Sequence, residues 1–272
     1  MDSNLLETDI HDILYATLSE SSDDLLVIDP TSRTIEALID VASEFDGSLP
    51  AIRMLADDGA LKTTLDDFIV ASRAADLIDS GTLSIRTLED ETTNSLLVSD
   101  ESVLAIVAAG DRIAALTTED SSFVDSARDA YSDHWEAAEA FRLRTPPITR
   151  VRETLTADIG EAARADFDAV LGSLETARGN GDGLDEVTIS LLVAAKNEIL
   201  LYDISKWGED VGIASKATFS RTKTRLEDNG LIATEKVPID VGRPRLRLQL
   251  GDERLLNAAP SDIASVAQQL LG

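Results

Sequence analysis

Cysteine is absent from this sequence of 272 residues, and histidine occurs only twice, as His11 and His134. The absence of cysteine excludes disulfide frameworks, thiol catalysis and thiolate metal sites. Aromatic residues make up only 4 % of the chain. No run of about 18 apolar residues, the length that crosses a bilayer, occurs either. The first residues lack the basic and apolar segments of a secretory signal, so we expect a cytoplasmic protein with no membrane partner.

Positive charge is also scarce. The chain has 24 Lys+Arg against 51 Asp+Glu, which gives a net charge of −27, and 43 % of its residues are hydrophobic. The apolar fraction is sufficient for a packed core, whereas the acid surplus excludes general binding of polyanions. Carboxylates spread along a chain with few lysines and few aromatics are typical of halophilic proteins, because molar salt screens their mutual repulsion. An ordinary acidic bacterial protein is the alternative interpretation.

One segment departs from this acidity. Residues 184–250 contain ten cations and ten acids, including five of the six lysines of the chain, so the rest of the sequence carries the entire net charge. A tract without acid surplus in an otherwise acidic protein indicates contact with a negatively charged partner.

The N-terminal part alternates predicted helices and strands. Apolar residues at helical spacing predict helices over residues 2–20, 31–45 and 64–78. Short apolar runs predict strands over residues 25–28, 51–55, 82–88, 95–98, 103–108 and 112–117. This order predicts an α/β domain with a mixed sheet.

Two further helical segments, residues 123–141 and 151–178, precede a glycine-rich run at 179–183 that resists both helix and strand. We therefore expect an α/β sensor or dimerisation domain over residues 1–150 and a helical connector with a linker over 151–183. A winged helix-turn-helix DNA-binding domain is expected over 184–250, and a C-terminal helix within 251–272.

The winged-helix prediction rests on three helical patterns followed by two strands. The helices are predicted over residues 187–201, 203–211 and 215–229, and the strands over 231–237 and 245–250. In this architecture the third helix enters the major groove of DNA, and the hairpin forms the wing.

The predicted third helix has four cations and no acid between Ser215 and Arg225. Phe219 and Leu226 are spaced to lie on its buried side, but the central position near Lys223 is polar, so the two faces are defined only to within one position. On the second strand of the hairpin, alternate arginines share one face. The residues expected to contact DNA are Lys216, Thr218, Ser220, Arg221, Lys223, Thr224, Arg225, Arg243, Arg245 and Arg247. A winged helix that binds only protein, as in a subunit of a transcription complex, is the alternative.

The first domain shows no sign of catalysis. It lacks a phosphate loop, a nucleophile elbow, a dinucleotide fingerprint and a zinc motif, so we expect no catalytic residue, no metal and no cofactor. Both histidines are interpreted as surface or helix-packing residues. If this domain binds a small ligand, the candidates are the residues after its first strand, where a helix N-terminus offers free N–H groups to anions. These candidates are Asp29, Thr31, Ser32 and Arg33, and the alternative is that they only cap the next helix.

Two stretches of the sequence resemble haloarchaeal transcriptional regulators of the TbsP type. They are residues 116–155, with Phe123, Tyr131, Trp135 and the sequence Leu143-Arg144-Thr145-Pro146-Pro147, and the wing, with Gly242-Arg243-Pro244-Arg245. The resemblance covers essentially the whole chain. It implies a transcription factor, which we expect to be a homodimer, that binds a promoter operator of genes of central carbon metabolism, with a sugar or sugar phosphate as the candidate effector. The related TrmB regulators carry the DNA-binding domain at the N-terminus, so no sugar-binding residue is transferred.

Overall fold

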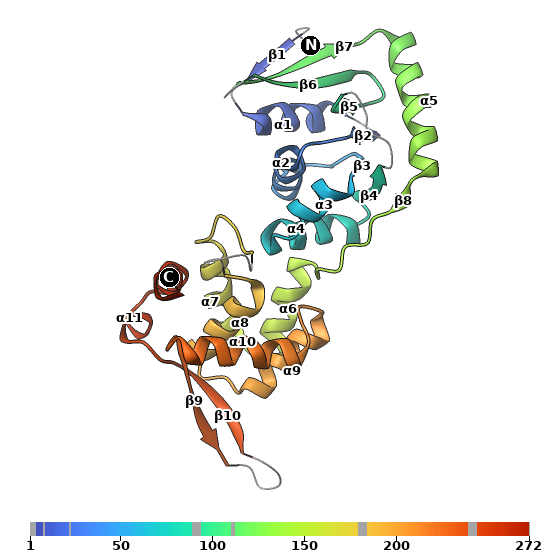
Figure 1. Ribbon diagram of the computed structural model, residues 1–272. Coiled ribbons are helices and arrows are strands. Elements are labelled where there is room, and N and C mark those ends of the chain that lie inside the picture. The colour runs from blue at the N-terminus through green and yellow to red at the C-terminus, as the bar shows by residue number, and fades with distance from the viewer. Residues whose placement is uncertain are drawn as a thin grey trace. The chain divides into compact units, whose positions relative to one another are not determined.

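The computed structural model describes residues 4–7, 9–21, 23–88, 94–109, 112–178, 184–238 and 244–271 (Figure 1). The chain divides into two compact units. The first comprises Met1–Asp66 and Arg73–Leu143, and the second comprises Asp67–Ser72 and Arg144–Gly272.

The first unit is built on a mixed sheet of eight strands in the order β1-β7-β6-β5-β2-β3-β4-β8. The β2, β3 and β4 strands are parallel, and the other neighbouring pairs are antiparallel. The strands are β1 (Asn4–Glu7), β2 (Asp24–Ile28), β3 (Ala51–Asp57), β4 (Leu83–Leu88), β5 (Leu96–Val98), β6 (Val103–Ala109), β7 (Arg112–Thr118) and β8 (Glu139–Ala140). The predicted mixed-sheet α/β domain is confirmed.

Helices complete the first unit. They are α1 (Ile10–Glu20), α2 (Ser32–Ser43), α3 (Asp58–Thr64), the C-terminal part of α4 (Phe68–Asp79) and α5 (Ser121–Ala137), whereas residues 68–72 of α4 belong to the second unit. The α5 helix packs Val124 and Trp135 onto one face of the sheet, where Leu26 of β2 lies. Leu25 and Val27 of the same strand alternate to the opposite face and are also buried. Both faces of the sheet are therefore covered at β2.

Three predicted helices of this unit differ from the structure. The segment predicted as one helix over residues 2–20 is the strand β1 followed by α1, which begins after Asp9 because the Asp9 carboxylate accepts the His11 N–H. The predicted helix over 64–78 lies mostly in α4, which begins after Asp67, and residues 58–64 form the separate α3. The α5 helix ends at Ala137, and the two residues of β8 then pair with β4.

The second unit contains the helices α6 (Ile148–Asp158), α7 (Glu161–Leu171), α8 (Glu186–Lys196), α9 (Leu201–Val211), α10 (Lys216–Asp228), α11 (Glu253–Leu256) and α12 (Ile263–Leu271), with the short 3₁₀ helix η1 (Pro260–Asp262). Its strands β9 (Ile232–Val237) and β10 (Arg245–Leu250) form an antiparallel hairpin. The predicted helical C-terminal region with a winged helix-turn-helix is confirmed.

The helices predicted as a connector, α6 and α7, share one hydrophobic core with the winged helix. Val151 of α6 and Phe167 of α7 are buried in the same cluster as Leu191, Trp207 and Phe219. The division between the units therefore follows Leu143. The prediction placed it at the glycine-rich run 179–183, which lies outside the described residues.

A buried carboxylate fixes the segment after α7. Asp67 is only 2 % exposed, and its Oδ1 accepts the backbone N–H groups of Ile69 at 2.9 Å and Ala177 at 3.2 Å. The hydroxyl of Thr176 donates to Oδ2, and Arg178 Nε lies 3.3 Å from the same oxygen. All these groups belong to the second unit.

Candidate nucleic-acid interface

The interface predicted from the sequence centres on α10. This helix begins at Lys216 because the hydroxyl of Ser215 accepts the N–H of Thr218 at 3.2 Å. It ends before Gly230, whose φ of 74° lies in the left-handed region that favours glycine. A second left-handed glycine, Gly212, with a φ of 97°, closes α9 and starts the turn into α10. Both ends of the predicted third helix are confirmed.

The packing of α10 on α9 is set by a glycine and a phenylalanine. Phe219 and Leu226 are fully buried on the inner side of α10. A Cβ atom at Gly208 of α9 would lie 2.3 Å from Cζ of Phe219, so only glycine leaves room for the ring. Because Phe219 occupies this space, the rotation of α10 about its own axis is fixed, and its opposite face lies in solvent.

The solvent face of α10 carries most of the residues predicted to contact DNA. Thr218 is half-buried beside its N-cap, and its hydroxyl is 3.1 Å from that of Ser215. The exposed side chains predicted to contact DNA are Lys216, Ser220, Arg221, Thr224 and Arg225. This face therefore combines short hydroxyl side chains with cations, the groups that hydrogen-bond base edges and phosphates.

Lys223, which was also predicted to contact DNA, lies on the inner side. Its side chain is 12 % exposed, and its Nζ lies 2.8 Å from Oε2 of Glu227. The hydroxyl of Thr234 on β9 donates to the other oxygen of Glu227 at 2.7 Å. The hydrogen bond from Lys223, assisted by that from Thr234, lowers the pKa of Glu227. Lys223 thus fills the polar central position of the buried side, and we leave it out of the proposed contact surface.

Most of the remaining cations have internal partners. Lys216 Nζ lies 2.6 Å from Glu209, and Arg225 donates to Thr188 Oγ1 at 3.0 Å. Arg221 reaches only the hydroxyl of its neighbour Thr218, at 3.4 Å. Among the residues that the structure describes, no carboxylate forms an ion pair with Arg221 or Arg225. Of the cations on the exposed face of α10, Arg221 therefore has the weakest contacts with the rest of the protein.

The wing contributes two described arginines, whereas Arg243 lies outside the described residues. The guanidinium of Arg245 stacks 4.2 Å from the ring centre of Tyr202 and lies 3.5 Å from Asp203. Arg247 lies 3.4 Å from Glu235 on the neighbouring strand. Both arginines lie on the same face of β10, as predicted, and are partly exposed.

Several residues that shape this surface were not predicted from the sequence. Gly208 and the acidic partners Glu209, Asp203 and Glu235 are examples. Glu227 had a sequence signal, since it follows Lys223 by four residues on a predicted helix. The other acidic partners are separated from their cations by a turn, a loop or a strand pairing, and local spacing shows none of these contacts.

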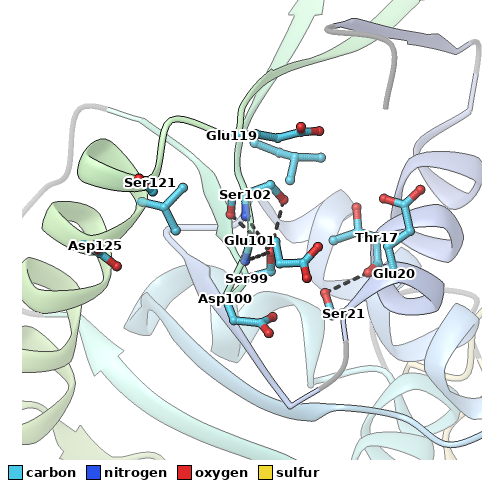
Figure 2. Close-up of a pocket in the computed structure, with 12 residues that line it drawn as sticks. Thr17, Glu20, Ser21, Ser99, Asp100, Glu101, Ser102, Glu119, Ser121 and Asp125 are labelled. Atoms are coloured by element: carbon cyan, nitrogen blue, oxygen red, sulfur yellow. Dashed lines mark hydrogen bonds between the residues drawn. The ribbon is translucent and has the colours of Figure 1, made fainter.

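A pocket of about 610 Å³ lies in the first unit (Figure 2). Hydroxyl side chains from α1, from the turn between β5 and β6 and from the start of α5 line it, and the described residues of the lining include no lysine or arginine. The carboxylates in its lining are Glu20, Asp100, Glu101, Glu119 and Asp125. Such a lining opposes the binding of an anion such as a sugar phosphate.

The residues predicted to bind an effector are not in the lining of that pocket. Thr31 caps α2, because its hydroxyl accepts the N–H of Thr34 at 3.2 Å, and Ser32 and Arg33 form the first turn. Asp29 has a φ of 47°, and its N–H donates to the carbonyl of Leu55 at 2.8 Å. The capping interpretation accounts for Thr31, and a ligand at these residues stays a prediction.

The described residues contain neither a metal-site cluster nor a membrane-spanning helix. No group of three or more His, Cys, Asp or Glu side chains there has the arrangement of a metal site. No helix of that part combines the length and the apolar character needed to span a membrane. His11 is exposed and lies 2.8 Å from Asp9, and His134 is also exposed.

Comparison with protein families assigns both units. Residues 2–146 match the family described as "Transcriptional regulator TbsP-like, N-terminal", and residues 147–268 match "Transcriptional regulator TbsP-like, C-terminal HTH domain". The boundary between the two matches lies close to the structural division after Leu143. Among the curated proteins compared with the chain, none matches it.

Comparison with solved structures gives distant likenesses. TrmBL2, described as an archaeal chromatin protein with a novel mode of DNA binding, matches at 18 % identity and a TM-score of 0.38, covering 52 % of this chain and 54 % of its own. The phospholipase D family member Nuc from Salmonella typhimurium matches at 8 % identity and a TM-score of 0.37, covering 51 % of this chain and 99 % of its own. NucT from Helicobacter pylori matches at 13 % identity and a TM-score of 0.35, covering 51 % and 98 %. These scores are too low to support a function.

Proposed function

Because the chain belongs to the family of TbsP-like transcriptional regulators, we propose that it binds double-stranded promoter DNA through the exposed face of α10. The observation that supports this most is the composition of that face. Ser220, Arg221 and Thr224 are exposed together, and Arg221 pairs with no described carboxylate although the chain has a net charge of −27.

The proposed binding uses two kinds of contact, one to base edges and one to phosphates. Arg221 is placed to bind a base edge or a phosphate in the major groove, while Ser220 and Thr224 hydrogen-bond base edges beside it. Lys216 lies at the N-terminus of the helix, where the side chain and the free backbone N–H groups are placed to bind a phosphate. Arg245 and Arg247 of the wing contact phosphates or enter the minor groove. Phosphate contacts position the protein, and the contacts to base edges select the sequence.

We further propose that the regulator acts as a homodimer on a partly palindromic operator. A two-fold axis places two copies of α10 in successive major grooves on one side of the duplex, about 34 Å apart. One recognition helix contacts only a few base pairs, so pairing two of them supplies the specificity that a promoter site requires.

The setting proposed for this function is the cytoplasm of a halophilic archaeon, with genes of central carbon metabolism as targets. The excess of 51 acids over 24 Lys+Arg supports the saline setting, and the resemblance to TbsP-type regulators supports the targets. Of the two candidate effectors, the acidic pocket of the first unit favours an uncharged sugar over a sugar phosphate, because the described part of its lining has five carboxylates and no cation.

Replacing Arg221 with alanine tests the proposed DNA contact. We expect R221A to lower the affinity for an operator duplex by about 10- to 100-fold, since an arginine on a base edge contributes on the order of 1–3 kcal/mol. The duplex is first selected by the full-length wild-type chain from random DNA, and binding is then measured by fluorescence anisotropy. The same titration gives the stoichiometry, for which we expect two chains per duplex.

The control for this experiment is R254A. Arg254 on α11 is exposed and pairs with Asp252 at 3.0 Å, so this variant removes the same charge away from α10. We expect its affinity to stay within about two-fold of wild type. Equal binding by R221A and wild type would contradict the proposal. Failure of the wild-type chain to select any sequence would favour the alternative, a winged helix that binds only protein.

A further inference from the structure

The start of α10 is held by a carboxylate of the protein itself. Glu209 of α9 lies seven residues before Lys216, across the turn of the helix-turn-helix. Its Oε2 is 2.6 Å from Nζ of Lys216, and its Oε1 accepts the backbone N–H of Lys216 at 3.3 Å. The two side chains are 43 % and 45 % exposed, so the pair lies at the surface beside the proposed DNA contacts.

The charges of this pair reinforce each other. The side-chain hydrogen bond between them lowers the pKa of Glu209 and raises that of Lys216, so both groups stay charged at neutral pH. The neighbouring Asp210 is engaged by Lys206 at 2.5 Å, on the same helix. Lys216 is thus the cation of α10 that meets its carboxylate from the preceding helix.

A DNA phosphate and this carboxylate require the same partner. Lysine side chains and helix N-termini are both common contacts of DNA phosphates, and Lys216 is an exposed lysine at a helix N-terminus. In the free protein Glu209 is already paired with the ammonium group of Lys216, and the negative charge of Glu209 repels an approaching phosphate. Exposed ion pairs of this kind are weak, so DNA can displace the carboxylate, but the displacement reduces the gain from the new contact.

We propose that Glu209 is an internal competitor of DNA phosphate for Lys216, and that it sets the affinity of this regulator and the salt dependence of its DNA binding. The inference rests on the proposed function, in which the start of α10 faces the DNA backbone. Binding then exchanges one anion for another at Lys216. Because the displaced Glu209 carboxylate stays beside the contact and attracts a cation itself, fewer cations are released overall than when an unopposed lysine binds a DNA phosphate. Glu209 therefore weakens DNA binding most in dilute salt, where an unopposed lysine would bind phosphate most tightly.

The test compares E209Q with the wild-type full-length chain on the duplex selected by the wild type. Glutamine keeps the size of the side chain but removes its charge. We expect E209Q to bind about three- to ten-fold more tightly at 0.1 M KCl. We also expect the slope of log affinity against log salt to become steeper by about two for the proposed dimer, which is about one for the Lys216–phosphate contact of each chain. A purely structural role of Glu209 predicts the opposite sign, namely weaker binding.

Two controls separate this effect from general charge removal. E161Q on α7 also neutralises a carboxylate in an exposed ion pair, with Arg164 at 3.1 Å, and should change the affinity less than two-fold. In a K216A background, E209Q should no longer tighten binding, because the competition requires the lysine.

The outcomes distinguish the two proposals. If the wild type binds its duplex but E209Q binds no more tightly than E161Q, the competition by Glu209 is wrong and the proposed function stands. If E209Q tightens binding equally with and without Lys216, the effect is general repulsion, which also overturns the inference. If the wild type selects no duplex, the proposed function itself fails.

Discussion

Replacing Gly208 with valine is expected to destabilise the second unit by about 3 kcal/mol and to lower its melting temperature by about 10 °C. Any side chain at this position begins with a Cβ atom 2.3 Å from Cζ of Phe219, which is fully buried and cannot turn into solvent. Glycine inside a helix costs about 1 kcal/mol relative to alanine, so its presence in α9 indicates a packing requirement. Thermal unfolding followed by circular dichroism measures the effect.

The same substitution is expected to abolish operator binding at concentrations that saturate the wild-type chain. The valine can be accommodated only if Phe219 moves, and Phe219 belongs to α10, so the helix must shift or rotate away from α9. The exposed face that includes Arg221 then no longer meets the groove in the required orientation.

A second substitution tests whether the clash with Phe219 is the cause. F219L removes the ring atoms nearest to Gly208 and alone leaves a cavity that destabilises the core. In the G208V background, F219L should lower the stability much less than it does in the wild-type chain, because the valine fills the space that the ring leaves. The proposed packing of α9 on α10 is wrong if the destabilisations of the two substitutions simply add. It is also wrong if G208V has the same melting temperature as the wild type.

Replacing Asp67 with alanine is expected to destabilise the second unit by about 2–4 kcal/mol, because several donors lose the buried acceptor that they share and a buried donor left unsatisfied costs about 1–3 kcal/mol. This carboxylate is 2 % exposed and accepts hydrogen bonds from two backbone N–H groups and the Thr176 hydroxyl. Its loss would also leave Arg178, whose Nε is buried, without the carboxylate 3.3 Å away. Chemical denaturation of the full-length chain measures the free energy of unfolding.

Two further variants, D67N and D79A, serve as comparisons for D67A. D67N keeps an oxygen that can accept the backbone N–H groups, so it should lose less stability than D67A. D79A removes an exposed aspartate at the other end of α4 and should change the free energy of unfolding by less than about 0.5 kcal/mol. Equal stability of D67A and D79A would contradict the anchoring role of Asp67.

The winged helix could be predicted closely because its signals are local. Ser215 caps α10 and Gly230 ends it, and both residue types favour those positions for intrinsic reasons. The N-terminal strand β1 could not be predicted in this way. It pairs with β7, so that Asn4 lies opposite Leu116, and a pairing over this separation leaves no periodic trace in residues 2–20. The apolar residues of that stretch fit helical spacing equally well.

The unit to which α6 and α7 belong also depends on contacts between residues far apart in the sequence. Their sequence predicts helices, and helices are what the structure contains, but periodicity does not show which core a helix joins. Trp207 of α9 illustrates the difference, since its indole N–H donates to the hydroxyl of Thr154 on α6 at 3.0 Å. This contact between the predicted connector and the predicted DNA-binding domain helps to make them one unit.

The candidate site was predictable in its location but not in its detail. Counting charges identified the tract that lacks acid surplus, but it did not show that carboxylates lie within 4 Å of Lys216, Lys223, Arg245 and Arg247. The inward position of Lys223 depends on Glu227 and Thr234, and the second of these lies on another element. Arg221 was one of ten candidates in the sequence, and its lack of a described carboxylate partner singles it out in the structure.

Site-specific photo-cross-linking from α10 tests the central claim most directly. A photoreactive amino acid replaces Ser220 on the exposed face of α10 in one variant and Ser265, which is exposed on α12, in another. Both variants are irradiated as full-length chains bound to the duplex that the wild type selects. The account predicts cross-links from position 220 to bases within the operator and none from position 265. Efficient DNA binding without any cross-link from position 220 would contradict it.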